Sequence, residues 1–409
     1  MSERRTARGA SPWQQIICAM APSRRDIAGR TLAWLLPLAA LASVSVLQGL
    51  HNALRASQDF QYSPTRVLMR GADPYLTWLH GNPGGVIILS QQPNYAHALY
   101  LLLMPLAALP WPVAKLAWAA LNLASAVTVT LLMGGRPDAS PVRTAALLCI
   151  FLASTPFRVA IGNGQQALIV LVCLYAAWRS ARPAGASTIL AALGFAIGFS
   201  KYSFLPPYAH GLLLAKRTRL LVWALAALAA GWMIFSFLVG RPPAATLLEP
   251  VKVGSSAVGF GTADIMSLSR SLRADAEVFP GSSAACGLAC SILLCTLCRQ
   301  SLVHGDRLES FAITGLVSLV SFVHLSYDFV FLLPTLMLLP SLPRAPRLIT
   351  AAGLTYFWFG LKLIDMTLKP APGPVPILIN WLAGLGLLLV LDRAVACRIS
   401  TVSANPPGP

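Results

Sequence analysis

Charged residues are scarce in this sequence, and acidic residues are the scarcest. Only 11% of the 409 residues are charged, with 14 Asp and Glu against 31 Lys and Arg, whereas 56% are hydrophobic. A mean hydropathy of +0.66 excludes an ordinary soluble globular composition. Polar chemistry must therefore be confined to a few short stretches of the chain.

The sequence also lacks the short motifs of several enzyme classes. It has no GxxxxGK(S/T) phosphate loop, no HExxH, no GxSxG with triad partners and no DxD for a metal-bound nucleotide sugar. Cys286, Cys290, Cys295 and Cys298 have CxxxC and CxxC spacings, but they share one apolar segment with no second ligand pair. We interpret them as packing residues. We expect neither a metal nor another cofactor.

Long apolar runs are what the sequence does contain. Many approach the ~20 residues needed to cross the hydrocarbon core of a bilayer, and they are continuous rather than alternating as in a membrane barrel. They predict an all-α, multi-pass membrane protein with twelve crossings. The predicted segments are 31–50, 112–133, 143–160, 165–179, 185–200, 203–215, 220–240, 282–298, 309–324, 329–342, 347–365 and 374–393.

Basic residues cluster in alternate loops between these segments, which is typical of cytoplasmic loops. Residues 1–30 carry six arginines and are predicted to be a cytoplasmic basic N-terminus followed by a retained signal anchor. Residues 31–395 form the predicted membrane domain, with outer loops 51–111 and 241–281, and residues 396–409 a cytoplasmic tail. No single basic domain exists, so nucleic acid is not an expected partner.

One further apolar stretch, 94–109, does not fit as a crossing, because counting it would place the later basic clusters outside. We interpret it as an interfacial or re-entrant helix on the outer face. Crossings 185–200 and 203–215 are short for a hydrocarbon core of ~30 Å. Their shared tip should lie below the outer surface, where Lys201 is either a functional residue or a lysine that snorkels from a helix end.

This assignment of crossings and of inner and outer loops, the membrane threading, places most of the unusual polar residues on the outer face. They are Asp59, Tyr62, Asp73, Tyr75, Asn163, Gln165, Lys201, His324 and Asp328. His324 and Asp328 are four residues apart and would share a helix face. Taken singly, each residue is also explained as part of a turn, a cap or a solvated loop. Their convergence on one side of the membrane indicates a functional site.

Several of these residues lie in short motifs that resemble glycosyltransferase family 87. A GQ pair at Gly164 opens one segment, and a glycine-rich segment ends in Lys201. DFQY at Asp59 and GADPY at Gly71 are similar to the family's D-x-x-Y and G-x-(D/N)-P-Y in the first outer loop. SYD at Ser326 is similar to a late outer-loop element. Each motif is short, so the resemblance depends on several motifs occurring in the same order as in the family.

The resemblance covers about residues 30–345 and implies a GT-C fold and an integral-membrane glycosyltransferase. Such enzymes transfer a sugar, often mannose, from a polyprenyl-phosphate donor on the outer side of the membrane. The family's catalytic aspartate follows the first helix and carries over to Asp59. Where the family commonly has Tyr-Pro-Pro, this chain has Gln92-Pro93-Asn94, which leaves the acceptor and the sugar open.

A lipid-phosphate sugar carries its own leaving group, so the protein must deprotonate an acceptor hydroxyl and stabilise the departing phosphate. We expect Asp59 to be the general base, and Lys201 and His324 to hold the phosphate. Further contacts to sugar, acceptor or other site residues are expected from Tyr62, Asp73, Tyr75, Gln165 and Asp328. Asp328 would either orient His324 or contact the sugar. The expected partners are a polyprenyl-phosphate sugar donor, a glycolipid or glycan acceptor and the lipid bilayer.

Two other functions fit the same composition. A flippase for a lipid-linked sugar would also need many crossings and a lysine at membrane depth, although no repeat relates the two halves of the sequence. A scaffold without chemistry would leave the polar residues unexplained. The threading places the protein in the cell inner (plasma) membrane, with both termini cytoplasmic and the active site on the periplasmic or extracellular side.

Overall fold

The computed structural model describes residues 24–135, 140–180, 186–254, 262–272, 281–368 and 373–404. Within these ranges every regular element is a helix, which confirms the all-α expectation. The elements are α2 (Arg24–Arg55), α3 (Tyr62–Met69), α4 (Pro74–Leu79), η1 (Pro83–Gly85), α5 (His97–Ala107), α6 (Trp111–Gly134), α7 (Pro141–Ala153), α8 (Thr155–Gly162), α9 (Ala167–Ser180), α10 (Ala186–Phe199), η2 (Tyr202–Phe204), α11 (Leu205–Leu214), α12 (Thr218–Leu238), α13 (Pro243–Thr246), α14 (Glu249–Gly254), α15 (Ile265–Leu272), α16 (Ser282–Leu297), α17 (Arg299–His304), α18 (Arg307–Ser321), η3 (Ser326–Leu332), α19 (Leu333–Leu338), η4 (Leu339–Ser341), α20 (Arg344–Thr355), η5 (Tyr356–Gly360), α21 (Leu361–Leu368) and α22 (Pro374–Ala404).

Among the described residues, five helices are long and apolar enough to cross a membrane. They are Trp34–Arg55 within α2, Trp111–Gly134, Thr218–Leu238, the continuous run Arg344–Leu368, and Pro374–Thr401 within α22. Two bent pairs, α7 with α8 (60°) and α10 with α11 (114°), raise the number to seven if each is one span.

All twelve predicted segments fall on helices, but some of these helices are short. α9, α16 and α18 have 14, 16 and 15 residues. At 1.5 Å per residue, each is at most about 24 Å long, less than the ~30 Å hydrocarbon core. The count of twelve crossings therefore stays a prediction.

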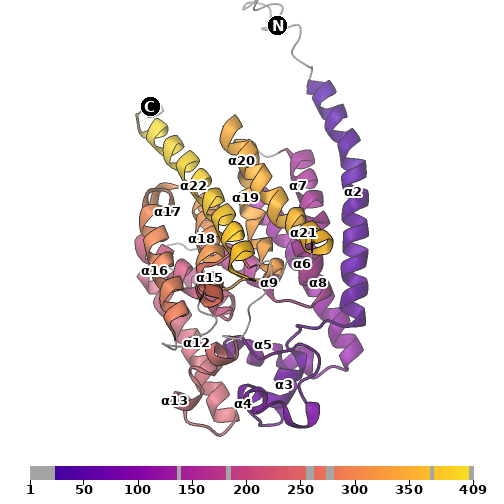
Figure 1. Ribbon diagram of the computed structural model, residues 1–409, viewed down its shortest axis with the longest axis vertical. Coiled ribbons are helices and arrows are strands. Elements are labelled where there is room, and N and C mark those ends of the chain that lie inside the picture. Colours follow the sequence, from indigo (N-terminus) through magenta and orange to yellow (C-terminus); the bar gives the residue numbers. More distant parts are fainter. Residues whose placement is uncertain are drawn as a thin grey trace, which may run out of the picture.

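The two ends of the described chain lie at the same end of the helix bundle (Figure 1). α2 starts there and runs along most of the molecule, and α22 finishes there. The short helices α3, α4 and α13 lie together at the opposite end. The first predicted outer loop is therefore on the side away from both ends, as the threading requires.

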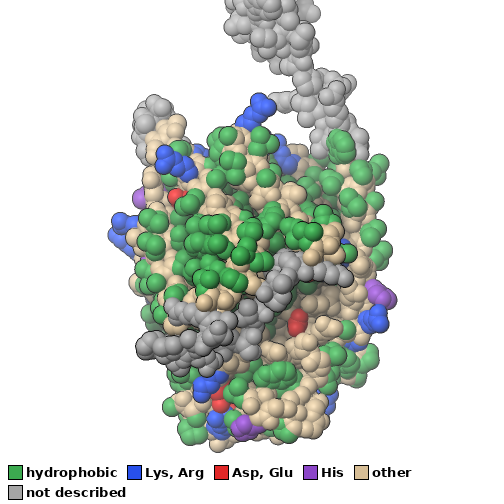
Figure 2. Space-filling model, in the orientation of Figure 1, with side chains coloured by type: hydrophobic (Ala, Val, Ile, Leu, Met, Phe, Trp, Pro, Cys, Tyr) green, Lys and Arg blue, Asp and Glu red, His purple; other side chains and the backbone are tan. Residues whose placement is uncertain are grey.

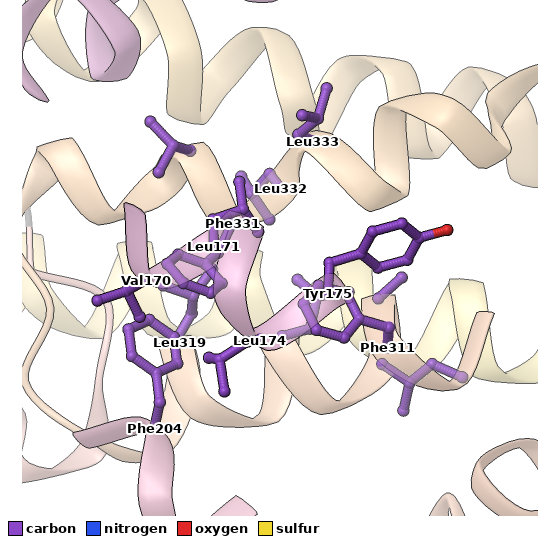
Figure 3. Packing of buried hydrophobic residues seen from close by; sticks show 14 of the residues in the cluster. Val170, Leu171, Leu174, Tyr175, Phe204, Phe311, Leu319, Phe331, Leu332 and Leu333 are labelled. Carbon is purple, nitrogen blue, oxygen red and sulfur yellow. The ribbon is translucent and has the colours of Figure 1, made fainter. Parts of the chain in front are cut away.

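The core forms around α18, which is buried from its second residue to its last. Phe311 of α18 packs with Tyr175 of α9, their ring centroids 5.1 Å apart, and Phe204 stacks on Phe331 of η3 at 3.9 Å. Figure 3 shows these side chains converging from α9, η2, α18 and η3. In lipid, such packing is held by dispersion and close approach. These contacts join α9 to α18 and η2 to η3, which carries Asp328.

Large apolar side chains are exposed on the outside of the bundle. Leu36 of α2, Leu190 of α10 and Phe237 of α12 are 76%, 72% and 85% exposed. Figure 2 shows hydrophobic side chains over most of one face, with Lys and Arg mainly toward its upper and lower ends. A surface of this kind is unfavourable in water and stable against lipid tails, which agrees with a multi-pass membrane protein.

Some predicted segment boundaries differ from the helix boundaries in the structure. The stretch 94–109 contains α5, whose 11 residues are about 16 Å long and too short to cross. α22 continues to Ala404, so the predicted tail 396–409 starts inside a helix. The predicted outer loop 241–281 contains α13, α14 and α15, while its residues 255–261 and 273–280 lie outside the described residues, as do residues 1–23 of the basic N-terminus.

Candidate active site

Asp59 lies in the turn between α2 and α3. Ser57, two residues earlier, has a positive φ of 45°, which turns the chain away from the helix. The Asp59 backbone N–H donates to the Asn163 carbonyl at 2.8 Å, so the turn is fixed to the segment that follows α8. The Asp59 carboxylate is half-buried and hydrogen-bonds to the side chains of Gln165 and Asn163.

Gly164 allows these two segments to meet. Its φ is +70°, and a Cβ there would lie 2.9 Å from the Cβ of Phe60 and 3.2 Å from that of Ser57. The indole of Trp118 donates to the Gly164 carbonyl at 2.7 Å and stacks on Phe60 with ring centroids 4.8 Å apart. Both the conformation and the space require glycine, and the position of Asp59 depends on it.

Lys201 lies at the bend between α10 and α11, and it is 9% exposed. Its ammonium is 2.5 Å from one carboxylate oxygen of Asp328, and Nδ1 of His324 is 3.1 Å from the other. His324 Nε2 is 3.0 Å from the hydroxyl of Ser318, which itself donates to the carbonyl of Ser203 at 3.0 Å. Asp328 thus orients both a lysine and a histidine.

Two tyrosines and Gln165 connect Lys201 with the Asp59 turn. The ammonium of Lys201 lies 4.9 Å from the ring centroid of Tyr327 and 5.9 Å from that of Tyr95, within the range of a cation–π contact. The Tyr95 hydroxyl donates to Gln165 Oε1 at 3.0 Å, and Tyr327 also hydrogen-bonds to Gln165. Gln165 is therefore shared by the base candidate and the residues around the lysine.

The electrostatics show that these groups belong to one site. Burial raises the pKa of the Asp59 carboxyl above its ordinary value, while hydrogen bonds from Gln165 and Asn163 and the positive charge of Lys201 lower it. A carboxylate with a raised pKa is a better proton acceptor. Figure 2 shows one acidic side chain in a hollow between the broad apolar region and the lower end of the molecule.

The structure brings together five of the predicted site residues: Asp59, Gln165, Lys201, His324 and Asp328. Tyr62 lies to one side, where its hydroxyl donates to the Leu109 carbonyl at 2.8 Å. Its predicted contact with substrate stays a prediction.

Asp73 and Tyr75 support the first loop. Asp73 caps α4, accepting from the backbone N–H of Tyr75 at 2.9 Å, and pairs with Arg241. Arg241 also pairs with Glu249 of α14 at 2.7 Å. Desolvation, together with the nearby Asp73, raises the pKa of Glu249 to about 6. The Tyr75 hydroxyl donates to the Tyr95 carbonyl at 2.6 Å, so Tyr75 reaches the site through Tyr95.

Sequence reasoning missed Tyr95 and Tyr327 as site residues, and it placed Asn163 on the outer face without giving it a role. Each is adjacent to a residue or motif that was singled out: Asn163 precedes the GQ pair, and Tyr327 precedes Asp328. Their side chains nevertheless contact Asp59, Gln165 or Lys201. A search for aromatic residues within a few positions of His324 would have found Tyr327, whereas Tyr95 lies 106 residues before Lys201 and had no such signal.

The family model of glycosyltransferase family 87 matches residues 95–326, more than half of the chain. The chain belongs to glycosyltransferase family 87. No curated protein and no solved structure matches it. The match contains Tyr95, Gln165, Lys201 and His324, whereas Asp328 lies two residues after its end and Asp59 lies 36 residues before its start.

Family membership decides between the functions that the sequence left open. Glycosyltransferase family 87 and the apolar helices together indicate a membrane glycosyltransferase, which acts on a sugar donor and an acceptor within or beside a lipid bilayer. Neither a flippase nor an inert scaffold is needed to explain the polar cluster.

Proposed function

We propose that this protein transfers mannose from a polyprenyl-phosphate donor to a hydroxyl group of a glycolipid or glycan acceptor on the outer face of the membrane. The observation that carries the proposal is the arrangement of Asp59, with its raised pKa, beside the Lys201–Asp328–His324 cluster. One part supplies a base and the other supplies cationic or donating groups, which are the two needs of the reaction.

Asp59 is the proposed general base. As the acceptor oxygen attacks the anomeric carbon of the donor sugar, its proton passes to the Asp59 carboxylate. The hydrogen bonds from Gln165 and Asn163 hold the carboxylate in place. Burial favours proton uptake, and the nearby Lys201 keeps enough of the group ionised to act.

Lys201 is the proposed direct partner of the leaving group, and His324 supports it through Asp328, because the two ring nitrogens of His324 contact Asp328 and Ser318. The bond between the anomeric carbon and the phosphate oxygen breaks with its electron pair on oxygen, so negative charge builds up on the polyprenyl phosphate. A preorganised cation stabilises such charge most where water is excluded. Asp328 orients both and is less than 2% exposed, so it acts as a positioning residue.

The proposed orientation places the Asp59 cluster outside and both chain ends inside. Three arginines of the other end are linked to one another: Arg307 donates to the Arg179 carbonyl, and Arg217 donates to the Trp178 carbonyl beside it. Clustering of basic residues at one end of a bundle favours its cytoplasmic placement. We propose the plasma (inner) membrane as the location, with residues 31–395 as the catalytic domain.

Sugar transfer by the purified full-length protein in lipid nanodiscs tests the proposal. The donor is polyprenyl-phosphate mannose, with a mixture of glycolipid acceptors, and the comparison is wild type against Asp59→Asn. The substitution keeps the shape and removes the base, so we expect transfer to fall by 10²-fold or more. Asp365→Asn, which changes an exposed carboxylate of α21, is the matched control and should retain full transfer.

Each outcome has a distinct meaning. Loss of transfer in folded Asp59→Asn with full activity in Asp365→Asn supports the assignment of the base. Equal transfer by wild type and Asp59→Asn would reject Asp59 as the base. If wild type transfers no sugar from polyprenyl-phosphate mannose but does transfer another lipid-linked sugar, only mannose as the donor sugar is rejected.

A further inference from the structure

A cavity of about 720 Å³ lies at the other end of the molecule, between α20 and α22 and beside the first turn of α18. In Figure 1 this is the end where α22 finishes, away from α3 and α4. The volume falls within the range of sites that bind small molecules, roughly 300–1,000 Å³. The cavity shares no residue with the candidate active site.

Most of the cavity wall is apolar. Ala345 and Ile349 of α20 face Leu389 and Val390 of α22 across it. Ile349 and Leu389 are 53% and 47% exposed, so this wall joins the lipid-facing surface of the bundle. A hydrocarbon chain can therefore enter from the bilayer without crossing a polar barrier.

The polar part of the lining is basic. Arg393 and Arg398 of α22 line the cavity with a single carboxylate, that of Glu309. Glu309 is already engaged, because it pairs with Arg398 and accepts from the backbone N–H of Asp306 at 2.9 Å. Arg393 is exposed and makes no ion pair within the described part of the chain. The lining thus carries a net positive charge beside an apolar chamber.

Two more arginines extend this basic character along α20. Arg344 and Arg347 are exposed at the start of the helix, and Arg347 donates to the Leu342 carbonyl at 2.6 Å, at the cavity edge. Basic pockets between membrane helices on the cytoplasmic side suit lipids with anionic head groups. A lipid without net charge would fill the apolar space but leave Arg393 without a counter-charge within the described part of the chain.

We propose that the cavity between α20 and α22 binds an anionic phospholipid of the cytoplasmic leaflet. One acyl chain occupies the apolar space between Ile349 and Leu389, and the phosphate lies against Arg393 and Arg398. The bound lipid connects α20 to α22. This site is independent of the proposed sugar transfer.

Native mass spectrometry of the delipidated full-length protein in detergent tests the proposal. Phosphatidylglycerol and phosphatidylcholine with the same acyl chains are the two probes. Each arginine near a phosphate contributes about 1 kcal/mol, which corresponds to a roughly five-fold change in affinity. We expect Arg393→Gln to weaken phosphatidylglycerol binding about five-fold and phosphatidylcholine binding by less, because the choline charge of phosphatidylcholine offsets that of its phosphate.

Two further variants separate the site from general surface charge. Arg299→Gln removes an exposed arginine of α17 that does not line the cavity, and it should bind phosphatidylglycerol as wild type does. Ala345→Trp fills the apolar part and should abolish the preference for phosphatidylglycerol although every arginine remains. Cys397, an exposed thiol in the lining, gives a second readout, because bound lipid should slow its alkylation.

The proposal fails if phosphatidylglycerol and phosphatidylcholine bind equally to wild type. It also fails if Arg299→Gln weakens binding as much as Arg393→Gln does, because the preference would then come from general surface charge. Unchanged binding in a folded Ala345→Trp protein would likewise place the lipid elsewhere.

Discussion

The ion pair between Lys201 and Asp328 should stabilise the fold in an asymmetric way. Their side chains are 11% and 1% exposed, so both charges are largely desolvated. Removing one member of such a pair costs about 3–5 kcal/mol, because the other charge is left buried. Asp328→Asn leaves Lys201 without a carboxylate, whereas Lys201→Met leaves Asp328 with His324 at 3.1 Å. We therefore expect Asp328→Asn to cost about 3–5 kcal/mol and Lys201→Met to cost less.

A double-mutant cycle measures this coupling. The free energy of unfolding in mixed micelles, followed by tryptophan fluorescence during SDS titration, is compared for wild type, both single variants and the double variant. We expect the double variant to be more stable than the sum of the single effects by about 2 kcal/mol or more. Lys362 and Asp365, which are 47% and 41% exposed, form the control pair and should couple by less than about 1 kcal/mol. The reasoning is refuted if the two single variants lose equal and small amounts of unfolding free energy and these losses simply add in the double variant.

Two further predictions concern the Asp59 turn. Gly164→Ala forces a left-handed alanine and a Cβ contact of 2.9 Å with Phe60, so it should lower both thermal stability and sugar transfer. The control, Gly240→Ala, has a φ of +63° and nothing within 4 Å, so it should cost only the backbone strain, about 1 kcal/mol. Equal losses in the two variants would contradict this prediction. Because burial raises the pKa of Asp59 above its ordinary value and a hydrogen bond from Asn163 lowers it, transfer should decline with falling pH at a higher pH than an ordinary aspartate would impose. In Asn163→Ala that decline should move to higher pH, and an unchanged pH profile of kcat/KM would argue against Asp59 as the titrating base.

The sequence was sufficient for the membrane class and for much of the site. Basic loops and apolar runs placed Asp59, Gln165, Lys201 and Asp328 on one side of the membrane, and the structure brings these four together. The four-residue spacing to His324 also indicated its contact with Asp328, although these residues lie in an extended turn and η3 rather than in a regular α-helix. The motifs that resemble glycosyltransferase family 87 indicated the type of reaction, sugar transfer.

What the sequence could not give is the exact geometry of the helices and of the first loop. Ser154 ends α7 in an extended conformation and caps α8, so one apolar run becomes two helices at 60°. Asp73 was expected to touch substrate, yet it stands before Pro74 and caps α4, a local signature that was readable in advance. Its pairing with Arg241 was not readable, because 168 residues separate the two.

The site itself is assembled by contacts between loops and helix ends. The Asp59 N–H binds the Asn163 carbonyl, and the Ala96 N–H donates to the Ser200 carbonyl at 2.8 Å, immediately before Lys201. The Ser318 hydroxyl holds the Ser203 carbonyl on the other side of that lysine. These contacts join the Asp59 turn to the segment after α8, and join the bend at Lys201 to the start of α5 and to α18. The two halves of the candidate site then meet through side chains, because the Tyr95 hydroxyl donates to Gln165 Oε1 at 3.0 Å.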